Sequence, residues 1–265
     1  AYGKTLVALG KTNENIVVLD ADLAKSTKTI EFAKVFPERF FDVGIAEQNL
    51  IGIAAGLAAA GKIPFASSFA IFATGRAFEQ VRNSVAYPKL NVKIAATHAG
   101  VTVGEDGGSH QTVEDIAVMR SLPNMTVIVP ADGVETEKAL QAIVDYQGPV
   151  YLRLGRPAVP VLYDDSYSFE IGEASVLRTG EDVSIIAAGI MVSKALEAAE
   201  LLAEEGIQAE VINMATIKPL DEKTILQSVR KTKRVVTAEE HSIIGGLGSA
   251  VAELVSEHHP VPVRR

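Results

Sequence analysis

A glutamate at the head of an apolar segment is the first candidate for chemistry. Glu47 opens the run EQNLIGIAAGLAAAG, and none of its sequence neighbours offers a charge partner. Five apolar residues around it have the spacing of a buried helical face: Ile45, Leu50, Ile53, Ala54 and Leu57. A carboxylate in apolar surroundings is costly unless something hydrogen-bonds it. Glu47 is therefore either an acid held for catalysis or a solvated first-turn acid that complements the helix dipole.

The segment Ala96–Asp115 is the second candidate. It follows an apolar strand-like run, and open α/β sheets place their ligands at the carboxyl ends of strands. It gathers several polar side chains among glycines: His98, Glu105, Asp106, His110 and Gln111. Their spacing matches no compact metal-ligand pattern, and the glycines indicate tight turns. Metal binding and plain polar packing remain alternatives, but recognition of a polyhydroxylated or anionic ligand is favoured.

Composition excludes several classes of protein. The chain of 265 residues has 25 Lys plus Arg and 33 Asp plus Glu, which gives a net charge of −8. This balance argues against binding to nucleic acid or to an anionic membrane. There is no cysteine, so disulfides and thiolate metal sites are excluded. No apolar run is long enough to span a bilayer and no leader opens the chain, so we expect a cytoplasmic protein.

The alternation of short β-branched runs with helical-period segments predicts the elements that position these candidates. Four runs read as strands: IVVLD from Ile16, VKIAAT from Val92, TVIVP from Thr126 and PVYLRL from Pro149. Residues 70–85 and 134–146 have helical period, and the stretch 156–168 reads as a linker, after which the alternation restarts. We expect an α/β protein of two domains, 1–160 and 170–265, each a mostly parallel sheet covered by helices.

Several motifs occur here in one order: GIAEQN, SSFAIF, THAGVTVGEDGGSHQ, MRSLPN, VIVPADGVE, LRLGRP and TIKPLD. Together they resemble the second half of transketolase, which comprises a pyrimidine-binding domain and a C-terminal domain. The resemblance covers nearly the whole chain. Two relatives of similar architecture are alternatives, namely 1-deoxyxylulose-5-phosphate synthase and the β subunits of 2-oxo acid dehydrogenases. The loop of that synthase lacks the Thr-His pair found here, so the combination of His98, GEDG and LGRP favours transketolase.

The resemblance implies thiamine diphosphate as cofactor and gives Glu47 a role. The cofactor becomes a nucleophile when it loses a proton from its thiazolium C2, which requires an acid hydrogen-bonded to its aminopyrimidine ring. Glu47 matches that activating acid. Phe69 and Phe72 match the aromatic wall of the aminopyrimidine, although the sequence adds a residue just after them, within Ala73–Arg76. Asp20 resembles an acid near the cofactor, and a strand-end cap is its alternative role.

The resemblance also assigns residues to a sugar phosphate substrate. Ser26 and Arg156 match groups that hold the phosphate, where a guanidinium supplies a planar fork of donors. His98, Asp106 and His110 match residues that contact substrate hydroxyls and phosphate. The implied reaction moves a two-carbon ketol unit from a ketose phosphate to an aldose phosphate, as in the pentose phosphate pathway.

One half of the cofactor site has no counterpart in the sequence. The family holds the diphosphate through Mg²⁺ with a GDG motif and a downstream Asn, and no such pair occurs here. We therefore expect the C-terminal subunit of a split transketolase, in which an N-terminal subunit binds Mg²⁺ and two copies of each chain assemble. The small-residue stripe Gly52, Gly56 and Ala60 would pack at a subunit contact. Both ends of the chain fall short of the family pattern, and a non-catalytic paralogue is the alternative from another class.

Overall fold

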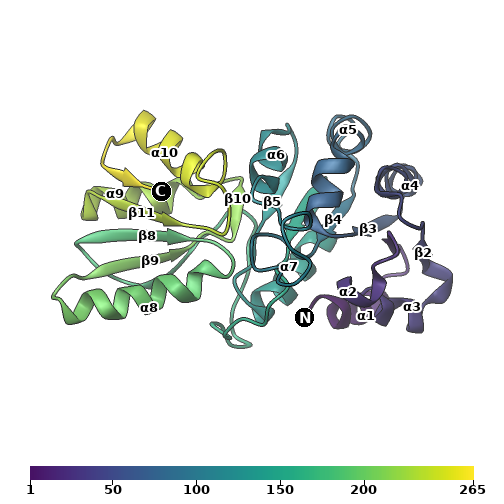
Figure 1. Cartoon of the computed structure of the whole chain (residues 1–265), viewed down its shortest axis with the longest axis horizontal. Coiled ribbons are helices and arrows are strands. Elements are labelled where there is room, and N and C mark those ends of the chain that lie inside the picture. The colour runs from purple at the N-terminus through teal and green to yellow at the C-terminus, as the bar shows by residue number, and fades with distance from the viewer.

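Runs of apolar and β-branched residues form the strands of two sheets, which lie end to end along the molecule (Figure 1). The computed structural model describes residues 1–265. In spatial order the first sheet contains β10 (Thr216–Lys218), β5 (Thr126–Ile128), β6 (Val150–Arg153), β4 (Lys93–Ala96), β3 (Ile63–Ser67), β1 (Ile16–Asp20) and β2 (Phe40–Asp42). The second contains β12 (Val263–Arg264), β11 (Val235–Ala238), β8 (Val183–Ala187), β9 (Ala209–Asn213) and β7 (Ser175–Arg178). All pairings are parallel except β10 with β5 and β7 with β9. The expected α/β fold with two mostly parallel sheets is confirmed.

Helices cover both faces of each sheet. One face of the first sheet carries α1 (Tyr2–Thr12), α2 (Ala24–Thr27), α3 (Ile30–Val35), η1 (Pro37–Arg39) and α7 (Gly133–Asp145). The other face carries α4 (Glu47–Ala59), η2 (Phe72–Arg76), α5 (Phe78–Gln80), η3 (Val81–Ala86) and α6 (Asp115–Ser121). In the second domain α8 (Met191–Glu204) lies on one face, and α9 (Glu222–Thr232) and α10 (Leu247–His258) lie on the other.

Side-chain alternation along β1 shows how one strand serves two cores. Val17 and Leu19 belong to the core beneath α4 and α6, whereas Ile16 and Val18 belong to the core beneath α1 and α7. All four are almost fully buried, as expected for a strand covered on both faces. The side chains of the polar loops are consequently confined to the ends of the strands.

Strand β10 crosses between the two domains. It lies in the second half of the chain, yet it pairs antiparallel with β5 at the edge of the first sheet. Thr216 and Ile217 are buried there, so β10 covers an edge whose backbone groups would otherwise be unpaired. The sequence pattern did not predict that β10 would pair in the first sheet, because a three-residue strand has too little periodicity to be assigned to either sheet.

The helix expected over residues 70–85 is interrupted twice by π-helical turns, η2 and η3. Single-turn π segments arise where one residue is added to an α-helix, and they are frequent at functional sites. The first of them, η2, contains the Ala73–Arg76 segment in which the sequence analysis placed an added residue. The π-helical turn lies where the resemblance predicts an added residue, beside Phe72.

The buried face predicted for the Glu47 segment is partly wrong. Leu50 and Ala54 are fully buried, but Ile45 is 75% exposed and Ile53 is 37% exposed. Ile45 precedes α4, where Ala46 has a non-helical backbone, so it lies out of phase with the helix. Ile53 lies instead on the exposed side of α4 with Gly52 and Gly56. No helix in the structure is both long enough and apolar enough to cross a membrane.

Candidate active site

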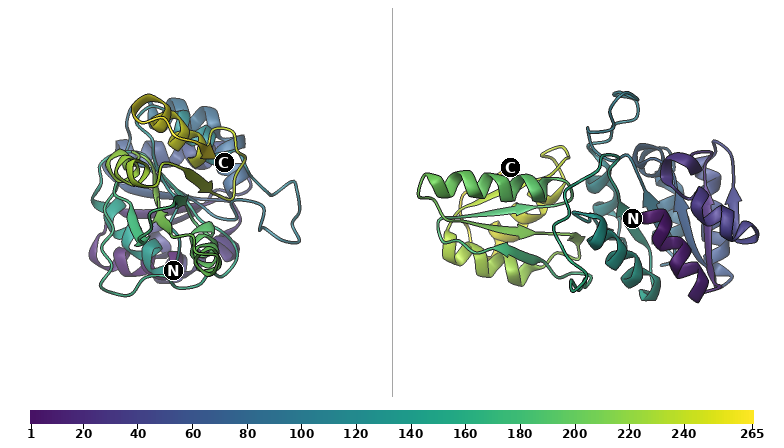
Figure 2. Two further views of the ribbon diagram at one scale, coloured as in Figure 1. Left: turned by 90° about the vertical axis from the view of Figure 1, so that its left-hand side faces the viewer. Right: turned by 90° about the horizontal axis from the view of Figure 1, so that it is seen from below.

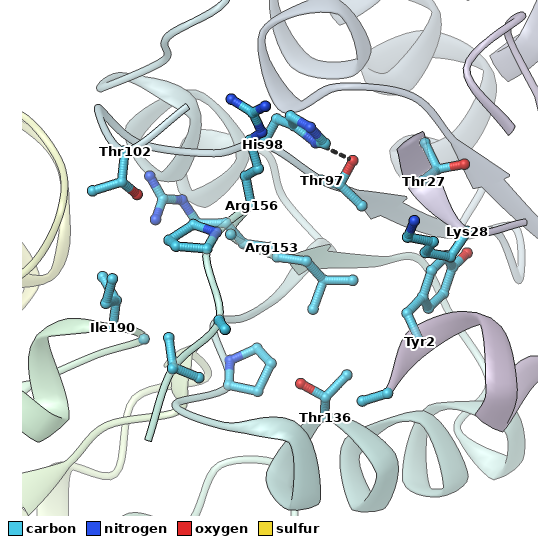
Figure 3. Close-up of a pocket in the computed structure, with 18 of the residues that line it drawn as sticks. Tyr2, Thr27, Lys28, Thr97, His98, Thr102, Thr136, Arg153, Arg156 and Ile190 are labelled. Atoms are coloured by element: carbon cyan, nitrogen blue, oxygen red, sulfur yellow. Dashed lines mark hydrogen bonds between the residues drawn. The ribbon is translucent and has the colours of Figure 1, made fainter. Parts of the chain in front are cut away.

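A cavity of about 950 Å³ opens at the carboxyl ends of the strands, and both domains contribute to its walls (Figure 3). Six of the residues singled out in the sequence line it: Ser26, Phe69, His98, Asp106, His110 and Arg156. They come from four separate segments of the chain, so the fold brings them together. Glu47, Phe72 and Asp20 do not line this cavity.

Aromatic rings form one wall of the site. Phe69 stacks on the imidazole of His98, with ring centroids 3.9 Å apart. The rings of Phe69 and Phe72 are nearly parallel at 6.1 Å, and His110 meets Phe72 edge to face at 5.3 Å. The two phenylalanines expected at the aminopyrimidine therefore lie beside two histidines expected at the substrate. Such a wall suits a planar ring next to a hydroxylated ligand.

His98 is held in a left-handed backbone conformation, with φ of 59°. Its side chain is buried, and its Nδ1 lies 2.9 Å from the hydroxyl of Thr97. Burial lowers the pKa of His98, and the nearby positive charge of Arg156 lowers it further. The imidazole is therefore neutral at pH 7. Nε2 is left to exchange a hydrogen bond with a ligand hydroxyl or oxyanion.

Arg156 crosses the long loop that carries Asp106. One guanidinium nitrogen donates to the carbonyl of Val103, and Nη2 donates to Glu105 at 2.9 Å. Asp106 lies 3.9 Å from Nη1, so its carboxylate is near the cation without forming a close pair. The Arg156 side chain is about one-third exposed and its partner Glu105 is largely exposed. An incoming anion could therefore replace Glu105 at the guanidinium.

Two lysines on the far side of the cavity were missed by the sequence analysis. Lys25 and Lys28 flank Ser26 along the α2 segment and line the same cavity. Figure 3 shows Lys28 on the side of the cavity opposite Arg156. Lys28 has a positive φ of 69°, and its charge contributes to the lowered pKa of His98. The two cations next to Ser26 were a signal in the sequence, but exposed lysines are too common to single out without a cavity.

Glu47 has a charge partner that its sequence neighbourhood does not show. The carboxylate is buried at the first turn of α4, and Arg76 Nη1 donates to its Oε2 at 2.8 Å. The Arg76 guanidinium also lies 4.6 Å from the centre of the Phe72 ring. Arg76, which is distant in sequence, thus joins Glu47 to the aromatic wall. The solvated first-turn role is excluded, since only 2% of Glu47 is exposed.

Asp20 is occupied by contacts within its own turn. It is fully buried at the end of β1, and it accepts from the backbone of Leu23 at 2.6 Å and from the hydroxyls of Thr27 and Thr29 at 2.7 and 2.9 Å. Burial raises the pKa of Asp20, against these hydrogen bonds. The geometry favours the strand-end cap, through which Asp20 shapes the α2 turn that carries Ser26. The contact of Asp20 with a cofactor stays a prediction.

The metal interpretation of the long loop also lacks a ligand set. No group of three or more His, Asp or Glu side chains is placed to hold a metal ion. His110 Nδ1 instead lies 3.0 Å from the hydroxyl of Ser109. The fold and the site together define a two-domain α/β protein with a cavity lined by cationic, polar and aromatic side chains.

Comparisons with known proteins agree with this class. Residues 1–161 match the family model of the transketolase pyrimidine-binding domain, and residues 172–265 match that of the transketolase C-terminal domain. The chain is 59% identical to a putative transketolase C-terminal section of Methanocaldococcus jannaschii, over 97% of this chain and 81% of that protein. It is 49% identical to a 6-deoxy-6-sulfo-D-fructose transketolase subunit of a Clostridium species, over 100% of this chain and 82% of that protein.

A solved structure extends the likeness to three dimensions. A split-gene transketolase described as an inactive beta4 tetramer superposes with a TM-score of 0.93 at 61% identity. The superposition covers 99% of this chain and 86% of that one. The chain belongs to the transketolase family. These proteins are transferases, and membership implies dependence on thiamine diphosphate.

Proposed function

We propose that the chain is the C-terminal subunit of a split transketolase, which transfers a two-carbon ketol unit from a ketose phosphate to an aldose phosphate. One observation carries the proposal: neutral His98, Asp106 and Arg156 converge on one cavity beside an aromatic wall. Asp106 offers an acceptor for sugar hydroxyls, His98 exchanges hydrogen bonds with them, and Arg156 offers donors to an anion.

The residues present fit one half of thiamine diphosphate. Phe69 and Phe72 offer faces for a flat ring, and Glu47 is a buried carboxyl group beside them. Arg76 donates only to Oε2 of Glu47. A ring nitrogen of the aminopyrimidine can therefore pair with the other oxygen, Oε1, or take the place of the Arg76 guanidinium. When bound, the cofactor supplies the carbon nucleophile that accepts the two-carbon unit. The chain's own part is to orient the ring and to place the Glu47 carboxyl group beside it.

The other half of the cofactor has no binding site in this chain. A diphosphate needs a cation or a cradle of backbone amides, and the long glycine-rich loop carries no metal-ligand cluster. We therefore assign diphosphate and Mg²⁺ binding to an N-terminal partner subunit. The exposed side of α4 supports this, because nothing lies within 4 Å of a Cβ atom built on Gly52 or Gly56. A partner helix can approach closely there, and Ile45 and Ile53 would be covered.

The anion on the sugar defines the substrate class. Arg156, Lys25 and Lys28 together place three cations on the cavity, which suits the dianion of a phosphate better than a singly charged sulfonate. The Clostridium relative acts on a 6-sulfo sugar by its name, so both anions belong in the test.

Reconstitution tests the proposal. The purified chain is mixed with the N-terminal transketolase subunit of the same source, thiamine diphosphate and Mg²⁺, and ketol transfer is measured with phosphorylated and sulfonated ketoses. Transfer is expected only from the mixture and preferentially from the phosphates. Glu47→Gln keeps the side-chain shape but removes the ionisable acid, and activity should fall by about two to four orders of magnitude. Transfer that survives Glu47→Gln, or a mixture inactive on every sugar, would refute the assignment.

A further inference from the structure

The loop that carries Asp106 and His110 projects from the body of the molecule in both views of Figure 2. We define residues 100–112 as the substrate loop. At its base Gly100 and Thr112 exchange two backbone hydrogen bonds of 3.0 and 3.2 Å. Beyond that base the first domain holds the loop through Gln111 Nε2, which donates to the carbonyl of Val101 at 2.8 Å, and through Arg156.

A carboxylate from the second domain adds a restraint at the start of the loop. Glu240 follows β11, and its Oε1 accepts from the backbone amides of Val101 and Thr102 at 2.8 and 2.6 Å. Hydrogen bonds to a charged acceptor are stronger than neutral ones. Two consecutive amides bound to a single oxygen fix the direction in which the chain leaves the base of the loop.

Glu240 is itself held rigidly. Its backbone carbonyl accepts from Arg153 Nη2 at 2.8 Å. Arg153 is buried and forms a 2.7 Å ion pair with Asp115, which also accepts from the hydroxyl of Tyr151 at 2.5 Å. The anchor of Glu240 therefore belongs to the interior of the first domain and not to a mobile surface segment.

Gly100 is shaped to receive this carboxylate. Its φ is +85°, a conformation that favours glycine. A Cβ atom built on Gly100 would collide with the Glu240 carboxylate. The position of the Glu240 carboxylate thus depends on a glycine at residue 100.

Neighbouring residues extend the same contact. The amide of Ser242 donates to the carbonyl of Val113 at 2.7 Å, and the amide of Ala117 donates to His241 Nε2 at 3.3 Å. The segment 240–242 therefore runs beside the end of the substrate loop and the start of α6. Glu240 is the member of this segment that reaches the cavity, since it lines the wall with Thr102.

We infer that Glu240 is a positioning residue through which the C-terminal domain fixes the substrate loop, and with it Asp106 and His110, for the sugar. The inference rests on the proposed function for its substrate, but the restraint on the loop can be measured in this chain alone. The second domain then has a defined task at the site, because it supplies the carboxylate that holds the loop.

Amide hydrogen exchange of the isolated chain is the first test. In Glu240→Ala the amides of Val101 and Thr102 should exchange roughly 10-fold faster or more, because each loses a charged acceptor. Glu240→Gln keeps an oxygen that can accept from both amides, so its exchange should rise less than about threefold. Unchanged exchange in Glu240→Ala would overturn the inference.

Kinetics of the reconstituted enzyme are the second test. In Glu240→Ala the KM for a ketose phosphate should rise about 10-fold with kcat within about threefold, because the loop contacts bind ground state and transition state alike. Glu240→Gln should restore most of the affinity. Unchanged KM despite faster exchange would also overturn the inference.

Glu239→Ala is the matched control. Glu239 has the same charge and lies on the same segment, but it accepts from the amides of Leu247 and Gly248 at the start of α10. Its removal should lower thermal stability without changing exchange at Val101 or Thr102. Equal effects of both substitutions on exchange would mean that Glu240 is only structural. If the natural chain and its partner transfer no ketol unit, the proposed function is wrong. Amide hydrogen exchange of the isolated chain then still decides whether Glu240 holds the loop.

Discussion

Replacing Lys93 with Met should change how the stability of the chain depends on pH. Lys93 lies in the middle of the first sheet with no exposed surface and forms no ion pair. Its Nζ donates to the carbonyls of Tyr146 and Gly148 at 2.8 and 3.0 Å. Burial nevertheless lowers the pKa of Lys93 from 10.5 to about 7, because the desolvated ammonium is disfavoured.

The sign and size of the effect follow from that pKa. Since the folded pKa lies below the unfolded one, the unfolded chain binds more protons between about pH 7 and about pH 10.5, and stability rises with pH across this window. At 1.36 kcal/mol per unit, the contribution of Lys93 to the free energy of unfolding rises by about 3 kcal/mol from about pH 7 to about pH 9.5. Below pH 7 this contribution is constant.

Urea unfolding of the natural chain and of Lys93→Met, at fixed protein concentration and several pH values, measures the difference directly. Over this pH range the free energy of unfolding of the natural chain should rise by about 3 kcal/mol more than that of the variant. Groups that titrate in both proteins cancel in this difference. Lys4→Met is the control, since Lys4 lies exposed on α1, and its difference from the natural chain should not vary with pH. A pH-independent difference for Lys93→Met would show that the carbonyls hold the ammonium fully charged and would refute the reasoning.

Three further outcomes are expected. A double-mutant cycle of Arg76→Met with Glu47→Gln, measured by unfolding, should give a coupling energy of about 1 kcal/mol. The value is modest because the Arg76 side chain is 49% exposed, although Glu47 is buried. Zero coupling would contradict the ion pair. Arg156→Ala should raise KM for phosphorylated sugars about 10-fold or more and leave unphosphorylated sugars nearly unaffected, and an equal penalty on both classes would assign Arg156 a structural role. Gly56→Leu should leave the isolated chain folded, or stabilise it by up to about 1 kcal/mol, but abolish association with the partner in sedimentation experiments. Retained association would move the contact away from α4.

The sequence by itself determined the fold class and most of the candidate residues. Strand periodicity and the placement of the long loop after β4 were sufficient to expect a ligand at the strand ends, and His98, Asp106, His110 and Arg156 do line one cavity there. The fold class and the place of the loop residues could be predicted because they depend on local patterns, whereas Arg156 was assigned only by the resemblance. Alternating apolar residues specify strands, glycines specify turns, and the parallel topology then places the loops at a common edge.

Only the tertiary structure decided which charges pair. Arg76 meets Glu47 across 29 residues of sequence, and Glu240 reaches Val101 from 139 residues away. Only the packed structure shows that Asp20 is hydrogen-bonded within its own turn. It also shows that Ile45 and Ile53 are exposed. A local pattern records how apolar and polar residues alternate, whereas an ion pair or a free surface depends on how separate elements pack. No spacing in the chain encodes those distances, so they become visible only when the elements are assembled.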